Sequence, residues 1–391
     1  MNAMSDTSGL EALAKQYEPT FAELITPDGQ LTRIRYAPCG KLMFAGGFDG
    51  AVHRWDLQYP VTPAESSESN KDAKPVFAEL ERMRGHNGWV TGLEVNPVAS
   101  QVVSGDSWGM LRCWTYQTDA ADKPKTRWAH DNAHDGWIRE VAISPDGKQV
   151  ASCGRDGVVK LWSADEGKLL FEWDAHHEDV HSVAFANDGK TLVSGDLRGV
   201  VNKWNLEAWD AKPVAQFDAK VLFLYHRLQE VGGVRCLRFS LDGKQLIVAG
   251  TRPDNGANVQ GYPSVLTFDY ESGELLHDIQ LSDDQNDCHI HDIILHRDQF
   301  MALVTSGQPG KGKMFLYRPG DEAPFYILSK LANCHSIALH PDGNQFAIAA
   351  TNGRSNGNGR RLTKDGKYLG NHSPIQLLAF PTGDQTKKDN S

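Results

Sequence analysis

The chain repeats one sequence pattern. Residues 137–162 read WIREVAISPDGKQVASCGRDGVVKLW, and residues 179–204 read DVHSVAFANDGKTLVSGDLRGVVNKW. Both stretches contain an apolar strand start, an Asp-Gly turn, a second strand ending in a small-residue run, a glycine turn and a strand ending in Trp. One such unit cannot bury both faces of its small sheet, so the repetition predicts sheets stacked against one another.

An aromatic residue closes the third strand of every copy and allows the copies to be counted. Seven copies are found, closed by Trp55, Trp114, Trp162, Trp204, Phe268, Tyr317 and Phe380. The shortest interval, from Trp162 to Trp204, fits a bare unit of four short strands, and longer intervals carry loop insertions. Radial stacking of such sheets leaves only short edges. The sequence therefore predicts an all-β, seven-bladed β-propeller of four-stranded antiparallel blades.

Asp-Gly pairs between alternating apolar runs predict tight hairpins inside the blades. These pairs are Asp146-Gly147, Asp188-Gly189, Asp242-Gly243 and Asp342-Gly343. The ring also has to close, because an open sheet edge is avoided in folded proteins. We expect the short alternating segment Phe21–Ile25 to pair with Ile375–Phe380 and complete the last blade.

Dipeptides at the repeat boundaries resemble the signature of the WD40 family. Gly85-His86, Ala133-His134 and Ala175-His176 match its Gly-His element, and Trp55-Asp56 is an intact Trp-Asp at a repeat end. The resemblance covers roughly residues 20–380. It is strong in repeats one to four, whereas repeats five to seven keep the period and lose the signature. Seven blades is the number most common in that family.

The resemblance also implies a structural hydrogen-bond network that runs from His through Ser and Asp to Trp. Repeat three matches it fully with His134, Ser152, Asp156 and Trp162. In repeats two and four, Trp108 and Arg198 stand where the Asp is expected, and repeat one keeps Asp49 but lacks the His. These sets are expected to be structural rather than catalytic, because each Ser lies within a strand and not on an exposed elbow.

Composition narrows the classes of function. The formal net charge of −10 argues against general binding to a nucleic-acid backbone. No apolar run approaches the length of a membrane span, and residues 1–18 lack the pattern of a signal peptide. The six cysteines are spread over six repeats without a C-x-x-C pair, as expected for reduced thiols. We therefore expect a cytoplasmic protein without a membrane anchor or cofactor.

The chain divides into a polar arm at 1–19, a propeller at 20–380 and a disordered tail at 381–391. A short helix is expected at Gly9–Tyr17. Gln58–Lys74 is predicted to be a polar loop on the bottom rim. Four insertions are predicted on the top rim: apolar Ala219–Gly233, long enough for a short helix, Gly-rich Thr251–Pro263 and Gly307–Lys313, and basic Asn352–Ser373.

The top rim is read from the residue after the first apolar position of each first strand, which faces the channel entrance. These residues are Thr32, Thr91, Arg139, His181, Arg235, His291 and His335, and the residues two places earlier are Gln30, Trp89, Trp137, Asp179, Gly233, His289 and Asn333. The turns before the third strands add Phe48, Trp108 and Arg155.

Large aromatic residues and arginines therefore gather on one sector of the top rim. Such residues are enriched at binding hot spots, and a group of exposed aromatics favours a partner. The predicted partner-binding residues are Phe48, Trp89, Trp108, Trp137, Arg139, Arg155, His181, Arg235, Arg360 and Arg361. The alternative is that Trp89 and Trp137 only fill space between neighbouring blades.

A second group of residues is His289, His291 and His335, which stand at matching places on adjacent blades. Three imidazoles are able to bind zinc or another transition metal, but three hydrogen-bonded rim histidines are the favoured interpretation. Cys288 and Cys334 are expected to point away from them.

No catalytic or nucleotide-binding motif is found. Gly307-x-x-Gly310-x-Gly312 lacks the Lys-Ser ending of a phosphate loop, and no G-x-S-x-G elbow is present. The sequence thus favours a non-catalytic interaction scaffold that binds a protein or peptide on its top face, with an acidic segment favoured by the basic loops. Two alternatives stay open: an enzyme or metal-dependent binder using the three histidines, and an assembly element held by Ala219–Gly233.

Overall fold

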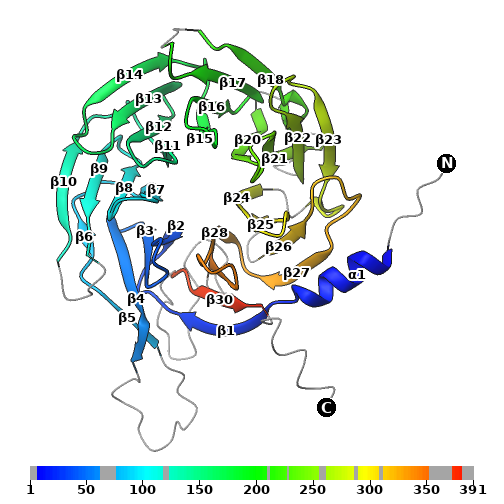
Figure 1. Ribbon diagram of the computed structural model, residues 1–391, viewed down its shortest axis with the longest axis horizontal. Coiled ribbons are helices and arrows are strands. Elements are labelled where there is room, and N and C mark those ends of the chain that lie inside the picture. The colour runs from blue at the N-terminus through cyan, green and yellow to red at the C-terminus, as the bar shows by residue number, and fades with distance from the viewer. Residues whose placement is uncertain are drawn as a thin grey trace, which may run out of the picture.

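A computed structural model describes residues 7–61, 76–117, 123–208, 212–226, 229–254, 261–285, 289–307, 311–351 and 372–380 of the chain. Seven antiparallel sheets surround one central axis, and the chain visits them in order around the ring (Figure 1). This architecture confirms the predicted seven-bladed β-propeller.

Every blade has an inner strand next to the central channel and three strands further out. The inner strands are β2 (Leu31–Tyr36), β7 (Val90–Val95), β11 (Ile138–Ile143), β15 (Val180–Phe185), β20 (Gln229–Phe239), β24 (His289–Leu295) and β28 (Cys334–Leu339). The second strands are β3 (Leu42–Gly47), β8 (Gln101–Asp106), β12 (Gln149–Gly154), β16 (Thr191–Asp196), β21 (Gln245–Pro253), β25 (Met301–Ser306) and β29 (Gln345–Ala350).

The outer half of each blade holds the third and fourth strands. The third strands are β4 (Ala51–Val61), β9 (Leu111–Thr115), β13 (Val158–Ser163), β17 (Val200–Asn205), β22 (Gly261–Asp269), β26 (Gly312–Tyr317) and β30 (Ile375–Ala379). The outermost strands are β5 (Val76–Glu79) with β6 (Met83–Arg84), β10 (Lys125–His130), β14 (Leu169–Asp174), β18 (Ala215–Asp218), β23 (Leu275–Gln280), β27 (Tyr326–Leu331) and β1 (Thr20–Ile25).

The ring closes where the sequence predicted. Strand β1 pairs antiparallel with β30, with Thr20 opposite Ala379 and Ile25 opposite Ile375. Blade seven therefore combines the two ends of the propeller in one sheet, in the order β1-β30-β29-β28 (Figure 1). This pairing removes an open edge that would otherwise be available to other chains.

Glycine sets the turns between the first and second strands. In the Asp-Gly turns of blades three, four, five and seven, the glycine has φ between +69° and +79°, a conformation that side chains disfavour. A Cβ atom at Gly147 would also lie 2.5 Å from Asn96 Oδ1 of the neighbouring blade. The four predicted hairpin turns are confirmed.

The hydrophobic core lies between neighbouring blades rather than inside them. One cluster joins Leu111 and Cys113 of blade two to Ile138 and Trp162 of blade three. Another cluster joins Ile279 of blade five to Ile290 and Phe315 of blade six. Each blade thus buries its faces against its neighbours, as the repeat argument required.

The N-terminal arm is docked on the ring. Helix α1 (Thr7–Gln16) covers most of the predicted helix, and Tyr17 follows it with 6% of its surface exposed. The Tyr17 ring lies 4.7 Å from that of Phe300 and 5.6 Å from that of Phe380, and its hydroxyl donates to Asp298. The arm therefore contributes to the core of blades six and seven.

Three insertions differ from their predictions. In Thr251–Pro263, expected to be a loop, β21 continues to Pro253 and β22 begins at Gly261, so the described ends of the insertion are paired strand. Ala219–Gly233 does not form the expected α-helix: a single 3₁₀ turn, η1 (Lys220–Leu222), leads into β19 (Phe223–His226), which pairs with β20. The aromatic residues of this segment favour an extended conformation. At Gln58–Lys74, β4 continues as a strand to Val61, and residues 62–75 lie outside the described residues.

The prediction that blades two and four lack the network's acid is wrong. Asp106 Oδ2 lies 3.2 Å from His86 Nδ1, and Asp196 Oδ2 lies 2.9 Å from His176 Nδ1. Both aspartates end the second strand, whereas Asp156 of blade three sits two positions further on and lies 3.0 Å from His134. A strand end and the turn after it lie close together, so an aspartate at either position reaches the network histidine of its own blade.

The remainder of each network has the same geometry. In blades two to four, the His Nε2 lies 2.7–2.8 Å from the Ser Oγ, and the Trp Nε1 donates to that oxygen at 2.9 Å. In blade one, Asp49 instead lies 3.0 Å from His53, which belongs to the third strand. The structural set predicted for repeat three, with Ser152 and Trp162, has the expected contacts.

Five cysteines are described as free thiols. Cys39 is exposed, and the buried ones are Cys113, Cys153, Cys236 and Cys334. Burial raises the pKa of Cys113 and of Cys236 to about 12, so these two thiols are not nucleophiles at neutral pH. Among the described residues, no helix has the length and apolar character needed to cross a bilayer.

Candidate functional site

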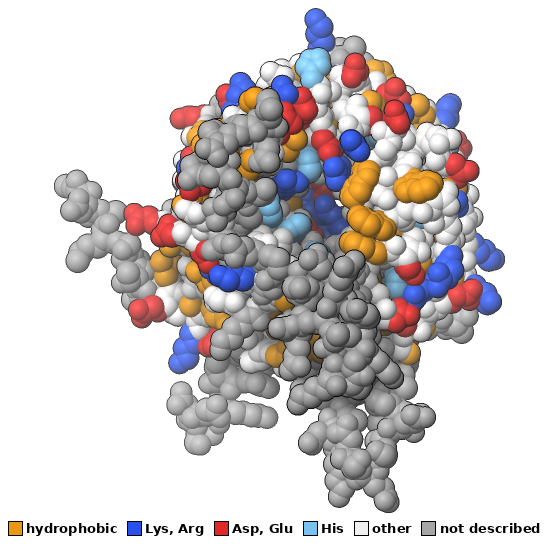
Figure 2. All heavy atoms as spheres, turned by 180° about the vertical axis from the view of Figure 1, so that it is seen from behind, with side chains coloured by type: hydrophobic (Ala, Val, Ile, Leu, Met, Phe, Trp, Pro, Cys, Tyr) orange, Lys and Arg blue, Asp and Glu red, His pale blue; other side chains and the backbone are white. Residues whose placement is uncertain are grey.

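The seven inner strands bring the predicted rim residues to one end of the central channel. Two of them tie blades together: the Thr91 hydroxyl donates to Ile138 O at 2.5 Å, and the Thr32 hydroxyl donates to Val90 O. Among the others, the basic and histidine residues line the channel mouth: Arg139, His181, Arg235, His289, His291 and His335. Figure 2 shows this face, on which basic and histidine side chains line a central hollow and hydrophobic side chains lie beside it.

Three aromatic rings beside the mouth form what we call the aromatic platform: Phe48, Trp89 and Trp137. Phe48 and Trp89 stack with centroids 4.5 Å apart and an interplanar angle of 11°, and Trp89 meets Trp137 edge to face at 5.5 Å. The Arg139 guanidinium carbon lies 4.8 Å from the Trp137 centroid. Trp89 nevertheless keeps 44% of its surface exposed, so the rings support one another without being covered.

Toward the mouth, Arg139 begins a series of polar contacts between side chains. Arg139 Nε lies 3.1 Å from both carboxylate oxygens of Asp179. Asp179 Oδ2 lies 3.8 Å from His181 Nε2, and Arg235 Nη1 donates to His181 Nδ1 at 3.0 Å. Because His181 accepts at Nδ1, its neutral ring carries the proton on Nε2. These contacts hold two arginines at fixed positions around the mouth.

Four histidines at the mouth are held neutral. Burial, together with Arg235 and Arg139, lowers the pKa of His181 well below its usual value. Burial lowers the pKa of His335 to about 4, and burial with Arg235 lowers that of His289 to about 4. For His291, burial, the two neighbouring histidines and two arginines act in the same direction. At neutral pH these rings offer uncharged donors and acceptors.

Two adjoining cavities open at the mouth. The first, here called the mouth pocket, has a volume of about 330 Å³ and is lined by Arg33, Arg139, His181, Arg235, His289, Ile290 and His291. The second, here called the aromatic pocket, has a volume of about 270 Å³ and is lined by Leu31, Thr32, Arg33, Phe48, Trp89, Thr91, Trp137, His291 and His335. Arg33 and His291 line both cavities.

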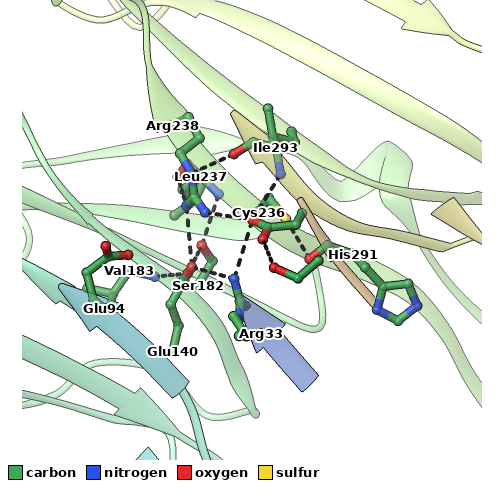
Figure 3. Close-up of polar contacts among 12 residues, drawn as sticks. Arg33, Glu94, Glu140, Ser182, Val183, Cys236, Leu237, Arg238, His291 and Ile293 are labelled. Carbon is green, nitrogen blue, oxygen red and sulfur yellow. Dashed lines mark hydrogen bonds and ion pairs between the residues drawn. The ribbon is translucent and has the colours of Figure 1, made fainter. Parts of the chain in front are cut away.

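Below the mouth, the channel is filled by a buried charge network, which we call the waist. Arg33 Nη1 lies 3.3 Å from Glu140 and 3.5 Å from Asp292, and Arg238 reaches the same two carboxylates at 3.3 and 3.1 Å (Figure 3). Arg35 joins Asp292 at 2.9 Å to Glu94 at 3.1 Å. Three arginines therefore meet three carboxylates.

The waist crosses the whole ring. The Ser336 hydroxyl donates to Asp292 at 2.6 Å and the Ser182 hydroxyl donates to Glu140, so each of the seven blades supplies at least one member. Burial opposes ionisation of Asp292, but Arg35, Arg33 and Arg238 hold its pKa well below the usual range. Sequence reasoning missed this network, although charged residues inside otherwise apolar strands were a visible signal.

The predicted partner residues fall into three groups. Phe48, Trp89, Trp137 and Arg139 come together as one surface, and His181 and Arg235 line the adjoining pocket. Trp108, 68% exposed, and the exposed Arg155 lie in the turns of blades two and three beside Gly88 and Gly136. Arg360 and Arg361 lie outside the described residues.

The three candidate metal ligands are neighbours without forming a compact ligand set. The rings of His289 and His291 are 6.4 Å apart, and those of His291 and His335 are 6.1 Å apart. His291 Nε2 contacts Ser306 Oγ at 2.5 Å. Within the described part of the chain, the one group with ligand atoms within 4.8 Å of one another is Asp28, His53 and Glu79. There the Arg82 guanidinium already lies against both carboxylates.

Comparison with known proteins agrees with the fold. The family model described as WD domain, G-beta repeat (WD40) matches residues 77–115, 126–163 and 167–205, which run from the outermost strand of blade one to the third strand of blade four. A search of curated proteins finds no match. WD40 propellers generally serve as protein-interaction scaffolds and are generally non-catalytic. The chain thus contains three WD40 repeats within its seven-bladed ring, which is consistent with a WD40-repeat β-propeller.

Proposed function

We propose that this protein is a non-catalytic scaffold that binds a protein or peptide segment at the channel mouth. The observation that carries the proposal is the aromatic platform with Arg139, in which Trp89 is exposed and the other members are half-buried, beside two open cavities. Rigid aromatic side chains with an arginine provide large contact area with little loss of conformational freedom. The alternative that Trp89 is only a filler between blades fits less well with its exposed surface.

The scaffold is formed before the partner arrives. Each platform residue stands at the start of an inner strand or in a turn between strands, and the ring closure fixes these strands relative to one another. A preformed surface avoids the loss of entropy that loop ordering would add to binding. An acidic partner segment is favoured because arginines line the mouth.

The proposal is tested by affinity capture with the full chain and the variants Trp137→Ala and Arg139→Ala. Truncation of a central interface residue commonly weakens binding by about 2 kcal/mol or more, roughly thirtyfold, so both variants should lose the partner. Circular dichroism and thermal unfolding check that they remain folded.

The matched control lies at the opposite end of the strands. Val98 is 71% exposed in the turn between β7 and β8, so Val98→Ala removes exposed apolar surface on the bottom face. It should capture the partner as well as the unaltered chain does. Loss of the partner in the Val98→Ala variant, with normal capture by the Trp137→Ala variant, would place the interface on the bottom face and refute the proposal.

A further inference from the structure

The mouth pocket has an uneven charge. Three of its lining residues, Arg33, Arg139 and Arg235, are positively charged, and none of the described residues that line it carries a carboxylate. Arg139 forms an ion pair with Asp179, which does not line the pocket. Arg33 forms ion pairs with Glu140 and Asp292 beneath the pocket. Positive charges held by partners on their outer side present a fixed positive potential to whatever enters.

The pocket is equipped to form hydrogen bonds as well. His181, His289 and His291 add neutral imidazoles to the guanidinium groups. Two of these rings are held by residues that do not line the cavity: Thr251 Oγ1 lies 3.2 Å from His289 Nδ1, and Ser306 Oγ lies 2.5 Å from His291 Nε2. A carboxylate or phosphate oxygen is the group that such donors bind best.

The aromatic pocket next to it has the opposite character. Leu31, Phe48, Trp89 and Trp137 provide apolar walls. Since Arg33 and His291 line both cavities, a group in one cavity lies beside a group in the other. One short ligand is therefore able to fill both.

We propose that the two cavities recognise a paired motif in the partner: an anionic group in the mouth pocket and an adjacent aromatic side chain in the aromatic pocket. This inference rests on the proposed function and specifies the chemistry of the segment that is bound. The anion is a carboxylate or a phosphate, since both suit arginine donors. The aromatic side chain stacks on a surface that already holds three rings.

Proton uptake should accompany binding. His291 faces Arg33 on β2, Arg235 on β20, His289 on its own strand and His335 on β28, while His181 faces Arg139, Arg235 and Asp179. An anion among these groups offsets the arginine charges and favours protonated imidazole. Binding of a carboxylate ligand, which stays ionised over this range, is therefore expected to strengthen as the pH falls from 7.5 to 5.5, while binding of an uncharged ligand does not.

The test uses the full chain and five small probes in calorimetric titrations: phenylacetate, phenyl phosphate, acetate, inorganic phosphate and benzyl alcohol. The first two carry both parts of the motif, and the others carry one. Phenylacetate or phenyl phosphate should bind at least about tenfold tighter than any single-part probe. Preference for phenylacetate assigns a carboxylate, and preference for phenyl phosphate assigns a phosphorylated side chain. Equal binding of all five probes would overturn the inference.

Two variants separate the two cavities. Arg235→Gln should weaken phenylacetate binding by about tenfold and leave benzyl alcohol unchanged, whereas Phe48→Ala should weaken benzyl alcohol and leave acetate unchanged. Thermal unfolding checks the fold of each variant. If both variants act equally on every probe, the two-part motif is wrong. If the partner is captured at the mouth but no probe discriminates, the motif fails while the proposed function stands.

Discussion

The mouth and the waist of the channel are built from neighbouring positions of the same inner strands, yet they treat charge in opposite ways. At the waist, three arginines face three carboxylates, and Asp292 has no exposed surface. At the mouth, the positively charged lining contains no acid among the described residues. On β2 the boundary between mouth and waist lies within two residues. Arg33 borders both regions, whereas Arg35 belongs to the waist alone.

This difference separates structure from recognition. Charges that satisfy one another inside the ring fix its shape and leave nothing for a ligand. At the mouth, Arg33 and Arg139 contact acidic partners on one side and border an open cavity on the other. They are therefore placed to bind an anionic group of another molecule. The comparison predicts that changes at the waist affect folding, whereas changes at the mouth affect binding.

The largest expected effect is at the waist. Asp292→Ala removes the carboxylate that Arg33, Arg35 and Arg238 share, and leaves these three arginines with only the carboxylates of Glu140 and Glu94. Removing one partner from a buried ion pair commonly lowers stability by about 3–5 kcal/mol. Urea unfolding measures this loss.

Glu94→Ala provides the comparison within the waist. Glu94 contacts Arg35 and keeps 30% of its side chain exposed, so its loss should lower stability by about 1 kcal/mol or less. If Asp292→Ala is as stable as the unaltered chain, the waist is not a structural element, and the comparison with the mouth fails.

The same rule applies outside the channel, in the His–Asp–Ser–Trp networks. Asp106→Ala and Asp156→Ala should each lower stability by about 1–3 kcal/mol, because a buried imidazole loses its carboxylate and backbone N–H groups lose their acceptor. Trp108→Ala and Arg198→Ala change exposed side chains in the corresponding turns of blades two and four, and should change stability by a few tenths of a kcal/mol. A large loss for Arg198→Ala, with none for Asp106→Ala, would restore the alignment suggested by the sequence.

The fold was predictable because its signals are local and repeated. An aromatic strand end, an Asp-Gly turn with positive φ and a column of buried apolar residues occur in copy after copy. The error in the networks has a geometric origin. Columns of a sequence alignment treat Asp106 and Asp156 as different positions, but in space each carboxylate reaches the network His of its own blade, His86 or His134.

The site was predicted in part, for a similar reason. The alternation of the inner strands was sufficient to place Trp89, Trp137 and Arg139 on one rim. The waist was not predicted, because which arginine faces which acid depends on the angles between blades. Arg33 reaches Glu140, which lies two blades away on the ring, and no local pattern encodes that contact.

Acid should distinguish the two regions of the channel by the pH at which each loses its contribution to stability. The pKa values of His289 and His335 are about 4, below the usual 6.5, so the unfolded chain binds more protons than the folded chain between these values. Stability should therefore fall as pH decreases from 7 to 5, by roughly 1–2 kcal/mol for each of the two histidines. The waist loses its contribution to stability at lower pH. The pKa of Asp292 is depressed, so its contribution to the free energy of unfolding is lost only below pH 3.8.

Variants show whether each pH range belongs to its region. Urea unfolding at several pH values measures the stability of the unaltered chain, of His335→Gln and of Glu94→Gln. His335→Gln should flatten the decline between pH 7 and 5, and Glu94→Gln should leave that decline unchanged. A decline in that range that does not change in the His335→Gln variant would show that other groups titrate there.

The smallest expected effect on stability comes from the acid next to the mouth. Asp179→Asn keeps the shape of the side chain and an acceptor for Arg139 but removes the negative charge that partly offsets Arg139. Asp179 lies at the rim with 15% of its side chain exposed, so stability should change by about 1 kcal/mol or less. Binding of phenylacetate should nevertheless strengthen by about threefold or more, because the pocket gains net positive charge.

Calorimetric titration of phenylacetate at low and at moderate salt measures this gain in affinity, and the gain should shrink as the salt concentration rises. Weaker binding of phenylacetate in this variant would mean that Asp179 belongs to the recognition surface, and the contrast between a balanced waist and an unbalanced mouth would no longer hold.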